Sequence, residues 1–270
     1  MAYAGISNIG EMDITQAASM LVEIRREGRV VADLPDDLRP TDLAQAYEIQ
    51  SGVVDGLLGA GNEAIGYKCA CTSPIAQEAL QIDRPLFGRL LSHTTSASGA
   101  ALDAGIFTHR VIEPEISIRV GSDVPERAGG HSAESIADHI DAVIPSIEIV
   151  DYRYESWTVG ALQVAADNAI HGWWVHGEPV SEWRDLDLAA MPVSASRNGE
   201  VVTTGSGANV LGSPLNVMAW LANELPQFGR QLQAGDLVTT GVTTDVFEAE
   251  AGDVIAAEFA GLGHCEVTFS

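Results

Sequence analysis

Lysine is almost absent from this sequence of 270 residues. Of its 14 basic residues only Lys68 is a lysine, and the others are arginine. This bias is typical of a base composition that favours arginine codons. A lysine amine can lose its proton and acts as a compact point charge, which an arginine guanidinium cannot do. Lys68 is therefore a candidate catalytic residue, and chance survival of one lysine is the alternative.

Positive charge of any kind is scarce. The formal net charge is −24, with 38 acidic residues against the 14 basic ones. A surface of this charge repels the phosphates of nucleic acids and the headgroups of anionic membranes. The composition therefore excludes nucleic acid and membranes as expected partners, and it leaves small molecules and other proteins.

Long apolar runs and a cysteine framework are also missing. No apolar run approaches 18 residues, and the N-terminus lacks a basic stretch followed by an apolar one. The three cysteines, Cys69, Cys71 and Cys265, cannot all pair with one another and do not have the spacing of a zinc site. These absences predict a reduced, cytoplasmic protein.

What is present predicts an α+β fold that is rich in strands. The apolar fraction of 46% suffices for a core, and many short strands separated by glycine indicate a rolled β-sheet with flanking helices. We expect a helical N-terminal part over residues 1–62, with Asp13 and Thr41 as helix N-caps. Residues 63–270 would form the β-rich catalytic domain, in which residues 92–104 are predicted as a surface link.

A candidate metal site starts from a strand with two glutamates. Residues 110–121 alternate between apolar and polar, which predicts a strand with one apolar face. Glu113 and Glu115 are two positions apart, so their carboxylates point to the same side and repel each other unless a cation binds. Glu148 supplies a third carboxylate from the apolar run 142–150. Three carboxylates without a histidine or cysteine partner favour Mg²⁺ or Mn²⁺ over Zn²⁺, and a solvated strand face is the alternative.

Short motifs follow one another in a fixed order from about residue 13 to the end of the chain. They are Gly-Tyr-Lys-Cys-Ala-Cys-Thr-Ser (66–73), Asp-Arg-Pro-Leu-Phe-Gly (83–88), Glu-Pro-Glu-Ile (113–116), Pro-Ser-Ile-Glu-Ile-Val-Asp-Tyr-Arg-Tyr (145–154), Ala-Asp-Asn (166–168), Val-Leu-Gly-Ser-Pro (210–214), Ala-Trp-Leu-Ala-Asn (219–223), Leu-Gln-Ala-Gly-Asp (232–236), Thr-Gly (240–241), Ala-Gly-Asp (251–253) and Gly-Leu-Gly (261–263). In order and spacing, the motifs together resemble the hydratase/decarboxylase branch of the fumarylacetoacetase-like superfamily. This branch includes 2-oxopent-4-enoate hydratases and 4-oxalocrotonate decarboxylases.

The resemblance implies a fumarylacetoacetase C-terminal-like rolled sheet and a set of site residues. It implies that Glu113, Glu115 and Glu148 hold the metal ion, Mg²⁺ or Mn²⁺, and that Lys68 belongs to the active site. Three further residues in or near the matching motifs are candidates for substrate binding: Ser73, Arg153 and Thr244.

One position departs from the hydratases of this branch. They usually carry an aspartate after the proline of their Asp-x-Pro-Asp-Phe/Tyr-Gly loop, and that aspartate is assigned a part in proton transfer. Here Leu86 stands at this position, three residues after Asp83, and the decarboxylases are more similar to this sequence because they have an apolar residue there. Hydration needs a base, whereas loss of CO₂ needs an electron sink and no water at the leaving carboxylate. Lys68, Asp83 and the position of Leu86 are thus the candidate catalytic positions.

Together these features predict a metal-dependent lyase of aromatic catabolism. It would act on a small 2-oxo acid, either a 2-oxo-enoate or a 2-oxo-enedioate, through a metal-stabilised enolate. Lys68 would add positive charge or move a proton, with a pKa lowered beside the cation. Hydration and decarboxylation both stay open because they share the enolate.

The sequence leaves two alternative functions open, and the family suggests how the chain assembles. The first alternative is C–C hydrolysis of an acylpyruvate, against which the absence of a His-x-x-Glu motif upstream of Glu113 argues. The second is a non-catalytic partner subunit, against which the intact glutamates and Lys68 argue. By analogy with the family we expect a homo-oligomer, or a complex with a pathway partner enzyme.

Overall fold

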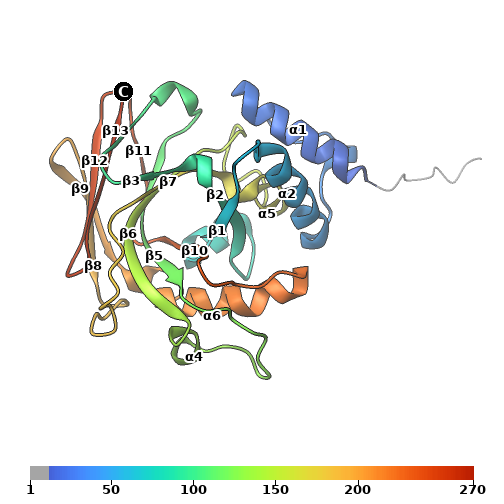
Figure 1. Ribbon diagram of the computed structural model, residues 1–270. Coiled ribbons are helices and arrows are strands. Elements are labelled where there is room, and N and C mark those ends of the chain that lie inside the picture. The colour runs from blue at the N-terminus through green and yellow to red at the C-terminus, as the bar shows by residue number, and fades with distance from the viewer. Residues whose placement is uncertain (1–11) are drawn as a thin grey trace, which may run out of the picture.

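The computed structural model describes residues 12–270, which form two β-sheets and a layer of helices (Figure 1). The strands are β1 (Ala64–Ala70), β2 (Leu86–Leu91), β3 (Thr95–Ala97), β4 (Ala100–Leu102), β5 (Val111–Val120), β6 (Ile140–Val150), β7 (His171–His176), β8 (Pro192–Arg197), β9 (Glu200–Ser206), β10 (Leu237–Val242), β11 (Phe247–Glu248), β12 (Val254–Phe259) and β13 (Gly263–Phe269). The α-helices are α1 (Ile14–Glu27), α2 (Leu43–Leu57), α3 (Pro74–Leu80), α4 (Ala133–Ala137), α5 (Ala161–Ala166) and α6 (Pro214–Glu224). None of the helices within residues 12–270 has the length and apolar character that crossing a membrane requires.

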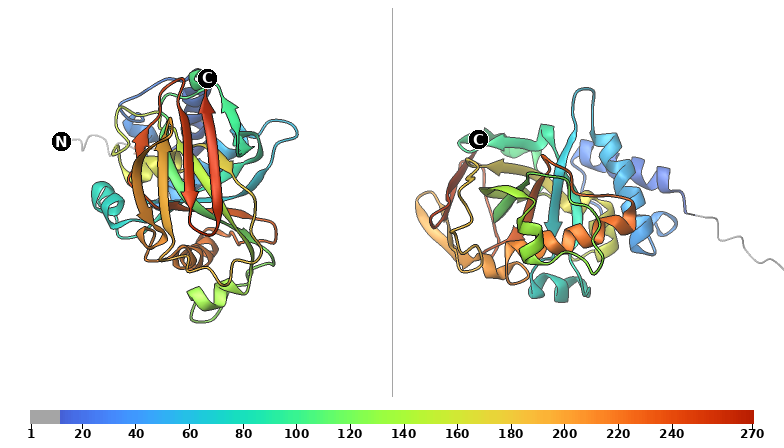
Figure 2. Two further views of the ribbon diagram at one scale, coloured as in Figure 1. Left: turned by 90° about the vertical axis from the view of Figure 1, so that its left-hand side faces the viewer. Right: turned by 60° about the horizontal axis from the view of Figure 1, so that its bottom comes forward.

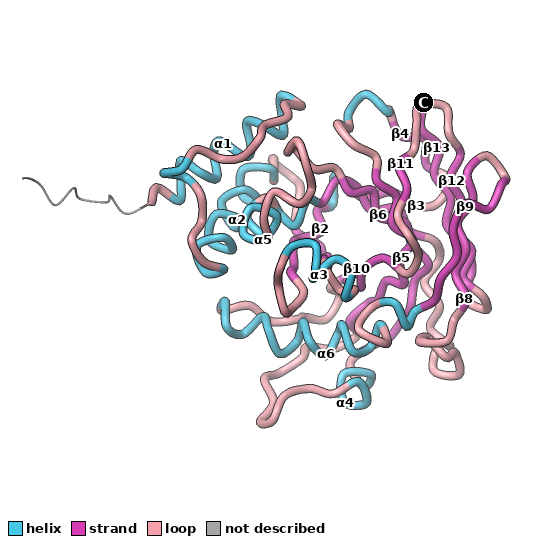
Figure 3. Tube along the Cα trace, turned by 180° about the vertical axis from the view of Figure 1, so that it is seen from behind, coloured by secondary structure: helices cyan, strands magenta, loops and turns pink. Residues whose placement is uncertain are grey.

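The larger sheet closes on itself. Its strands run in the order β2-β1-β10-β5-β6-β7-β3, with β11 paired to β5. β2 also contacts β7, so the sheet curls into a roll (Figure 3). The second sheet, in the order β4-β13-β12-β8-β9, packs on the roll through contacts of β12 and β13 with β6 (Figure 2, left, red and orange strands). This arrangement confirms the predicted rolled, β-rich α+β fold.

The helical layer lies beside the roll. α1 packs on α2, and α2 also packs on α5 (Figure 1). Asp13 caps α1 as predicted, because its carboxylate accepts a backbone N–H of the first turn at 2.9 Å. The prediction of Thr41 as the second cap is wrong: Asp42 caps α2, and Thr41 bonds a side chain one turn later. The predicted division between residues 62 and 63 falls in the loop between α2 and β1 and stays a prediction.

Residues 92–104 are not the surface link that was predicted. β3 pairs in parallel with β7 of the large sheet, and β4 pairs in parallel with β13 of the small sheet. These short strands consist mostly of serine, threonine and alanine, which give no apolar alternation from which a strand could be predicted. The segment therefore connects the two sheets.

One buried apolar cluster extends through the helical layer and both sheets. It includes Leu21 of α1, Ile116 of β5 and Ile255 of β12, all completely buried. Removal of this surface from water is the main driving force for packing the layers together. β5 is covered on both faces, because Glu115 and Ser117 on its polar side are 0% exposed. The alternative of a solvated strand face is therefore wrong.

Candidate active site

The centre of the large sheet brings the three predicted carboxylates together. Glu113 and Glu148 are direct partners in the antiparallel pairing of β5 with β6. Glu115 lies two residues further along β5, so its side chain is on the same face. One ligand atom from each of the three lies within 4.8 Å of the others, and they form the one such group of His, Cys, Asp or Glu side chains in residues 12–270.

The two oxygens of Glu115 have different surroundings. Oε2 accepts the backbone N–H of Gly241 at 2.5 Å, whereas Oε1 is buried and has no hydrogen-bond partner. Gly241 has a φ of +102°, and a Cβ at this position would lie 1.9 Å from Oγ1 of Thr72, so glycine is needed to bring this N–H to the carboxylate. A buried carboxylate oxygen without a donor is unfavourable, and a cation would satisfy it.

The three carboxylates differ in how readily they ionise. Burial raises the pKa of Glu113 to about 7, although Lys68 opposes this. Burial and repulsion by the other two carboxylates raise the pKa of Glu115. Burial also disfavours the charge of Glu148, but Lys68 and His171 lower its pKa to about 2. Full ionisation at neutral pH therefore requires more positive charge, and the oxygen donors fit a hard divalent cation.

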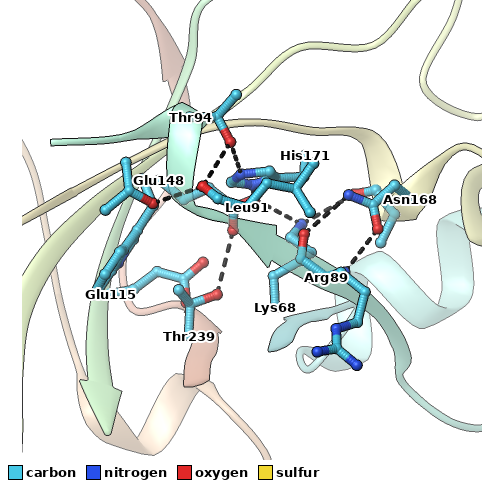
Figure 4. Close-up of polar contacts among 12 residues, drawn as sticks. Lys68, Arg89, Leu91, Thr94, Glu115, Glu148, Asn168, His171 and Thr239 are labelled. Atoms are coloured by element: carbon cyan, nitrogen blue, oxygen red, sulfur yellow. Dashed lines mark hydrogen bonds and ion pairs between the residues drawn. The ribbon is translucent and has the colours of Figure 1, made fainter. Parts of the chain in front are cut away.

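Lys68 of β1 reaches this cluster with a side chain that is 1% exposed (Figure 4). Its Nζ lies 3.2 Å from Oε1 of Glu148 and donates to the backbone oxygen of Ala169 at 3.1 Å. Burial alone would lower the pKa of Lys68, but the carboxylates of Glu148, Glu113 and Glu115 raise it above its usual value. The three negative charges outweigh burial in the protein without a bound cation, so the lowering expected beside a cation stays a prediction.

His171 belongs to the cluster and is missing from the sequence prediction, which assumed no histidine partner. Its Nδ1 lies 2.9 Å from Oε1 of Glu148, and its Nε2 lies 3.2 Å from Oγ1 of Thr94 (Figure 4). The side chain is 2% exposed, and burial lowers the pKa of His171 although Glu148 opposes this. Both ring nitrogens of His171 therefore have a polar partner.

A β-bulge explains why the strand pattern hides this residue. Glu148 pairs with Trp174 and Val150 pairs with His171, so Gly172 has no partner on β6. In an unbroken strand, His171 and Trp174 would point to opposite faces because they are three residues apart. The extra residue in the bulge turns His171 to the face that carries Glu148.

The turn before β7 presents the backbone oxygen of Ala169 to Lys68. Asn168, Ala169 and Ile170 have φ values of 50°, 50° and 53°, which residues other than glycine rarely adopt. The side chain of Asn168 holds this turn against β2 (Figure 4). Its Oδ1 accepts the N–H of Arg89 at 2.7 Å, and its Nδ2 donates to the carbonyl of Arg89 at 3.0 Å.

Leu86 and Asp83, the other candidate catalytic positions, have very different surroundings. Leu86 is completely buried in β2 and pairs with Ala70, two residues after Lys68 on β1. Leu86 and Lys68 therefore point to the same face of the sheet. The side chain of Asp83 is 90% exposed and pairs with Arg84. None of the polar contacts of Asp83 joins it to the carboxylate cluster.

The polar groups of the three predicted substrate-binding residues contact residues that are close to them in the sequence. Ser73 caps α3, and the hydroxyl of Thr244 donates to the backbone oxygen of Asp245 at 3.0 Å. Arg153 forms an ion pair with Asp151 and lines a cavity of about 170 Å³ that His171 also borders. None of these contacts reaches the carboxylates, so a role of these three residues in substrate binding stays a prediction.

Comparison with known proteins adds both sequence and structural relatives. The family model for the fumarylacetoacetate (FAA) hydrolase C-terminal region matches residues 75–270. The 2-keto-4-pentenoate hydratase 1 of Dechloromonas aromatica (strain RCB) is 33% identical over 265 residues, which cover 98% of this chain and 100% of the relative. The 4-oxalocrotonate decarboxylase of Pseudomonas putida is 32% identical over 241 residues, 89% of each chain. A solved 4-oxalocrotonate decarboxylase from Pseudomonas putida G7, complexed with magnesium and adipate, has a TM-score of 0.90 and 29% identity, and the match covers 95% of this chain and 97% of that one.

Proposed function

Because this chain belongs to the FAA hydrolase C-terminal family, we propose that it is a divalent-metal-dependent lyase of small 2-oxo acids. It adds water to a 2-oxo-enoate or removes CO₂ from a 2-oxo-enedioate. The observation that carries this proposal is the group of Glu113, Glu115 and Glu148, of which the last two are buried and in which Oε1 of Glu115 has no donor. We further propose that the enzyme acts in the cytoplasm as a homo-oligomer, alone or with a pathway partner enzyme.

The three glutamates would hold Mg²⁺ or Mn²⁺. One similar decarboxylase structure contains magnesium and another contains calcium, which are both hard cations that prefer oxygen ligands. When bound, the ion supplies a Lewis acid for the negative charge that develops on the 2-oxygen of the substrate. The sheet contributes the fixed positions of the carboxylates, because all three project from paired strands.

Lys68 would act as a fixed positive charge. Its contacts with Glu148 and Ala169 hold the amine beside the cluster. Such an ammonium group stabilises negative charge in a substrate and does not accept a proton from water. Leu86, on the same face, offers no group for proton transfer. These two properties favour decarboxylation over hydration.

Two substrates distinguish these reactions. The protein is incubated with Mg²⁺ and either 2-oxohex-3-enedioate or 2-hydroxypenta-2,4-dienoate, while CO₂ release is measured and products are followed by NMR. We expect CO₂ and a 2-hydroxydienoate from the first substrate. Conversion of the second substrate alone, to a 4-hydroxy-2-oxo acid, would identify a hydratase that works without the usual aspartate. Turnover of neither substrate at saturating Mg²⁺ would count against a lyase of this class.

Replacement of Leu86 by aspartate tests the specificity argument. Leu86→Asp places a proton-transfer group on the face of Lys68, so the ratio of hydration to CO₂ release should rise by about 10-fold or more. Leu86→Asn is the matched control, because it is polar and of similar size but cannot transfer a proton. Both variants bury a polar group at a cost of roughly 1–3 kcal/mol in stability, which circular dichroism would monitor. An equal product ratio in the two variants would contradict the role of this position.

A further inference from the structure

The carboxylate of Glu148 is held on one side by two donors. Its Oε1 lies 3.2 Å from Nζ of Lys68 and 2.9 Å from Nδ1 of His171, whereas Oε2 contacts only the hydroxyl of Thr239, at 3.4 Å. We propose that His171 is a positioning residue that fixes the orientation of Glu148 and leaves Oε2 free for the cation. This inference rests on the proposed metal site.

The direction of the hydrogen bond to Glu148 follows from the chemistry of the partners. An ionised carboxylate only accepts hydrogen bonds, so Nδ1 of His171, 2.9 Å from Oε1, carries a proton. Nε2 lies 3.2 Å from Oγ1 of Thr94, whose hydroxyl also lies within donor distance of the backbone oxygen of Leu91, at 3.3 Å. The chain Thr94–His171–Glu148 therefore fixes one ring orientation. This is the arrangement by which residues behind a metal ligand usually orient that ligand.

Lys68 cannot perform this task by itself. An ammonium group is a point charge that donates in several directions, and Lys68 also donates to the backbone of Ala169. The imidazole of His171 is a planar ring that is 2% exposed and fixed at both nitrogens. A single rigid donor of this kind determines which carboxylate oxygen points toward the neighbouring glutamates.

His171 is not itself a ligand in this arrangement. Nδ1 is directed at Glu148 and Nε2 at Thr94, so neither nitrogen is available to a cation. The group of potential ligands in the described part of the chain consists of the three glutamates alone. The bulge at Gly172 is what brings His171 behind Glu148, because regular pairing would turn it to the other face.

Titration of the metal-free protein with Mn²⁺, followed by calorimetry at one pH, tests this role. The variants are His171→Leu, which removes the donor, and His171→Asn, whose amide nitrogen takes nearly the place of Nδ1. We expect His171→Leu to weaken Mn²⁺ binding by about 10–100-fold and His171→Asn to restore it to within about 3-fold of the wild type. Thr94→Val keeps Nδ1 but removes the hydroxyl at Nε2, and we expect it to weaken Mn²⁺ binding by about 3–10-fold.

The outcomes separate this inference from the proposed function. If the wild type binds Mn²⁺ and His171→Leu binds equally well, the positioning role is refuted and the metal site stands. The role is also refuted if His171→Asn binds as weakly as His171→Leu. If the wild type does not bind Mn²⁺, the proposed metal site is refuted and the inference with it. Should His171→Leu not fold, Thr94→Val decides, because wild-type affinity in that variant would refute the chain of hydrogen bonds.

Discussion

At the scale of single residues, the site has an imbalance of charge. Three carboxylates and one ammonium group lie together, and all but the half-buried Glu113 are buried. Full ionisation of Glu113, Glu115, Glu148 and Lys68 gives a net charge of −2. Uncompensated charge is costly inside a protein. The positive charge of Lys68 lies against Glu148. Glu113 and Glu115 therefore keep raised pKa values. A divalent cation has the charge that this group lacks.

Glu115→Gln should separate metal binding from folding. Glutamine keeps an oxygen that can accept the N–H of Gly241 but removes one negative charge, so Mn²⁺ affinity should fall by at least about 10-fold. The thermal stability of the metal-free protein should stay the same or increase, because repulsion with Glu113 and Glu148 is relieved. Calorimetric titration and thermal unfolding would measure both quantities.

The exposed Glu134 provides the control for this substitution. Glu134→Gln removes the same charge at the start of α4, away from the carboxylate cluster, and should leave Mn²⁺ affinity unchanged. Unchanged affinity in Glu115→Gln as well would remove Glu115 from the proposed metal site.

The raised pKa of Glu113 predicts how stability depends on pH. A carboxyl group whose pKa rises from 4.5 to about 7 on folding favours the folded state below pH 4.5, and this contribution is lost as the pH rises to about 7. Glu115 acts in the same direction. A bound cation removes this loss, so the increase in Tm caused by saturating Mg²⁺ should grow across this window.

Thermal unfolding with EDTA or with Mg²⁺ at several pH values would measure this difference. Glu148 is expected to contribute nothing across the same window, because its pKa of about 2 keeps it ionised throughout. An effect of Mg²⁺ on Tm that is constant from pH 5 to 7, or that decreases, would contradict the raised pKa values.

At the scale of elements, two irregular segments bring further groups to the carboxylate cluster. The bulge at Gly172 turns His171 toward Glu148. The turn of residues 168–170 presents a carbonyl to Lys68 through three successive residues with positive φ. Each such residue other than glycine costs of order 1 kcal/mol or more, and asparagine tolerates it best. The sheet and the side chain of Asn168 must therefore hold this turn in place.

Ala169→Gly should relieve part of this strain. The backbone of Ala169 has φ 50° and ψ 36°, which glycine adopts without a steric penalty, so the variant should be more stable by about 1 kcal/mol. Ala165→Gly in α5 is the control, since a glycine inside a helix should lower stability by about 1 kcal/mol. Denaturant unfolding would compare the two, and equal destabilisation of both would mean that the turn is not strained.

At the scale of the whole molecule, the sequence predicts features that depend on local pattern. Alternation in residues 110–121 placed Glu113 and Glu115 on one face, and the rarity of lysine pointed to Lys68. The sequence does not predict features that depend on contact between distant segments. β3 and β4 are strands because β7 and β13 pair with them, and His171 faces Glu148 because of a bulge that no single-strand period indicates.

The one lysine also makes the chain a sensitive reporter of its own unfolding. A protease that cleaves only after lysine can cut this sequence at one bond, which would give fragments 1–68 and 69–270. That bond lies within β1, between β2 and β10, and the Lys68 side chain is 1% exposed. Cleavage therefore requires disruption of the central sheet, because fraying of loops or helices does not expose this bond. The two fragment bands on a gel would thus report the fraction of molecules whose central sheet has opened, with no label added to the protein.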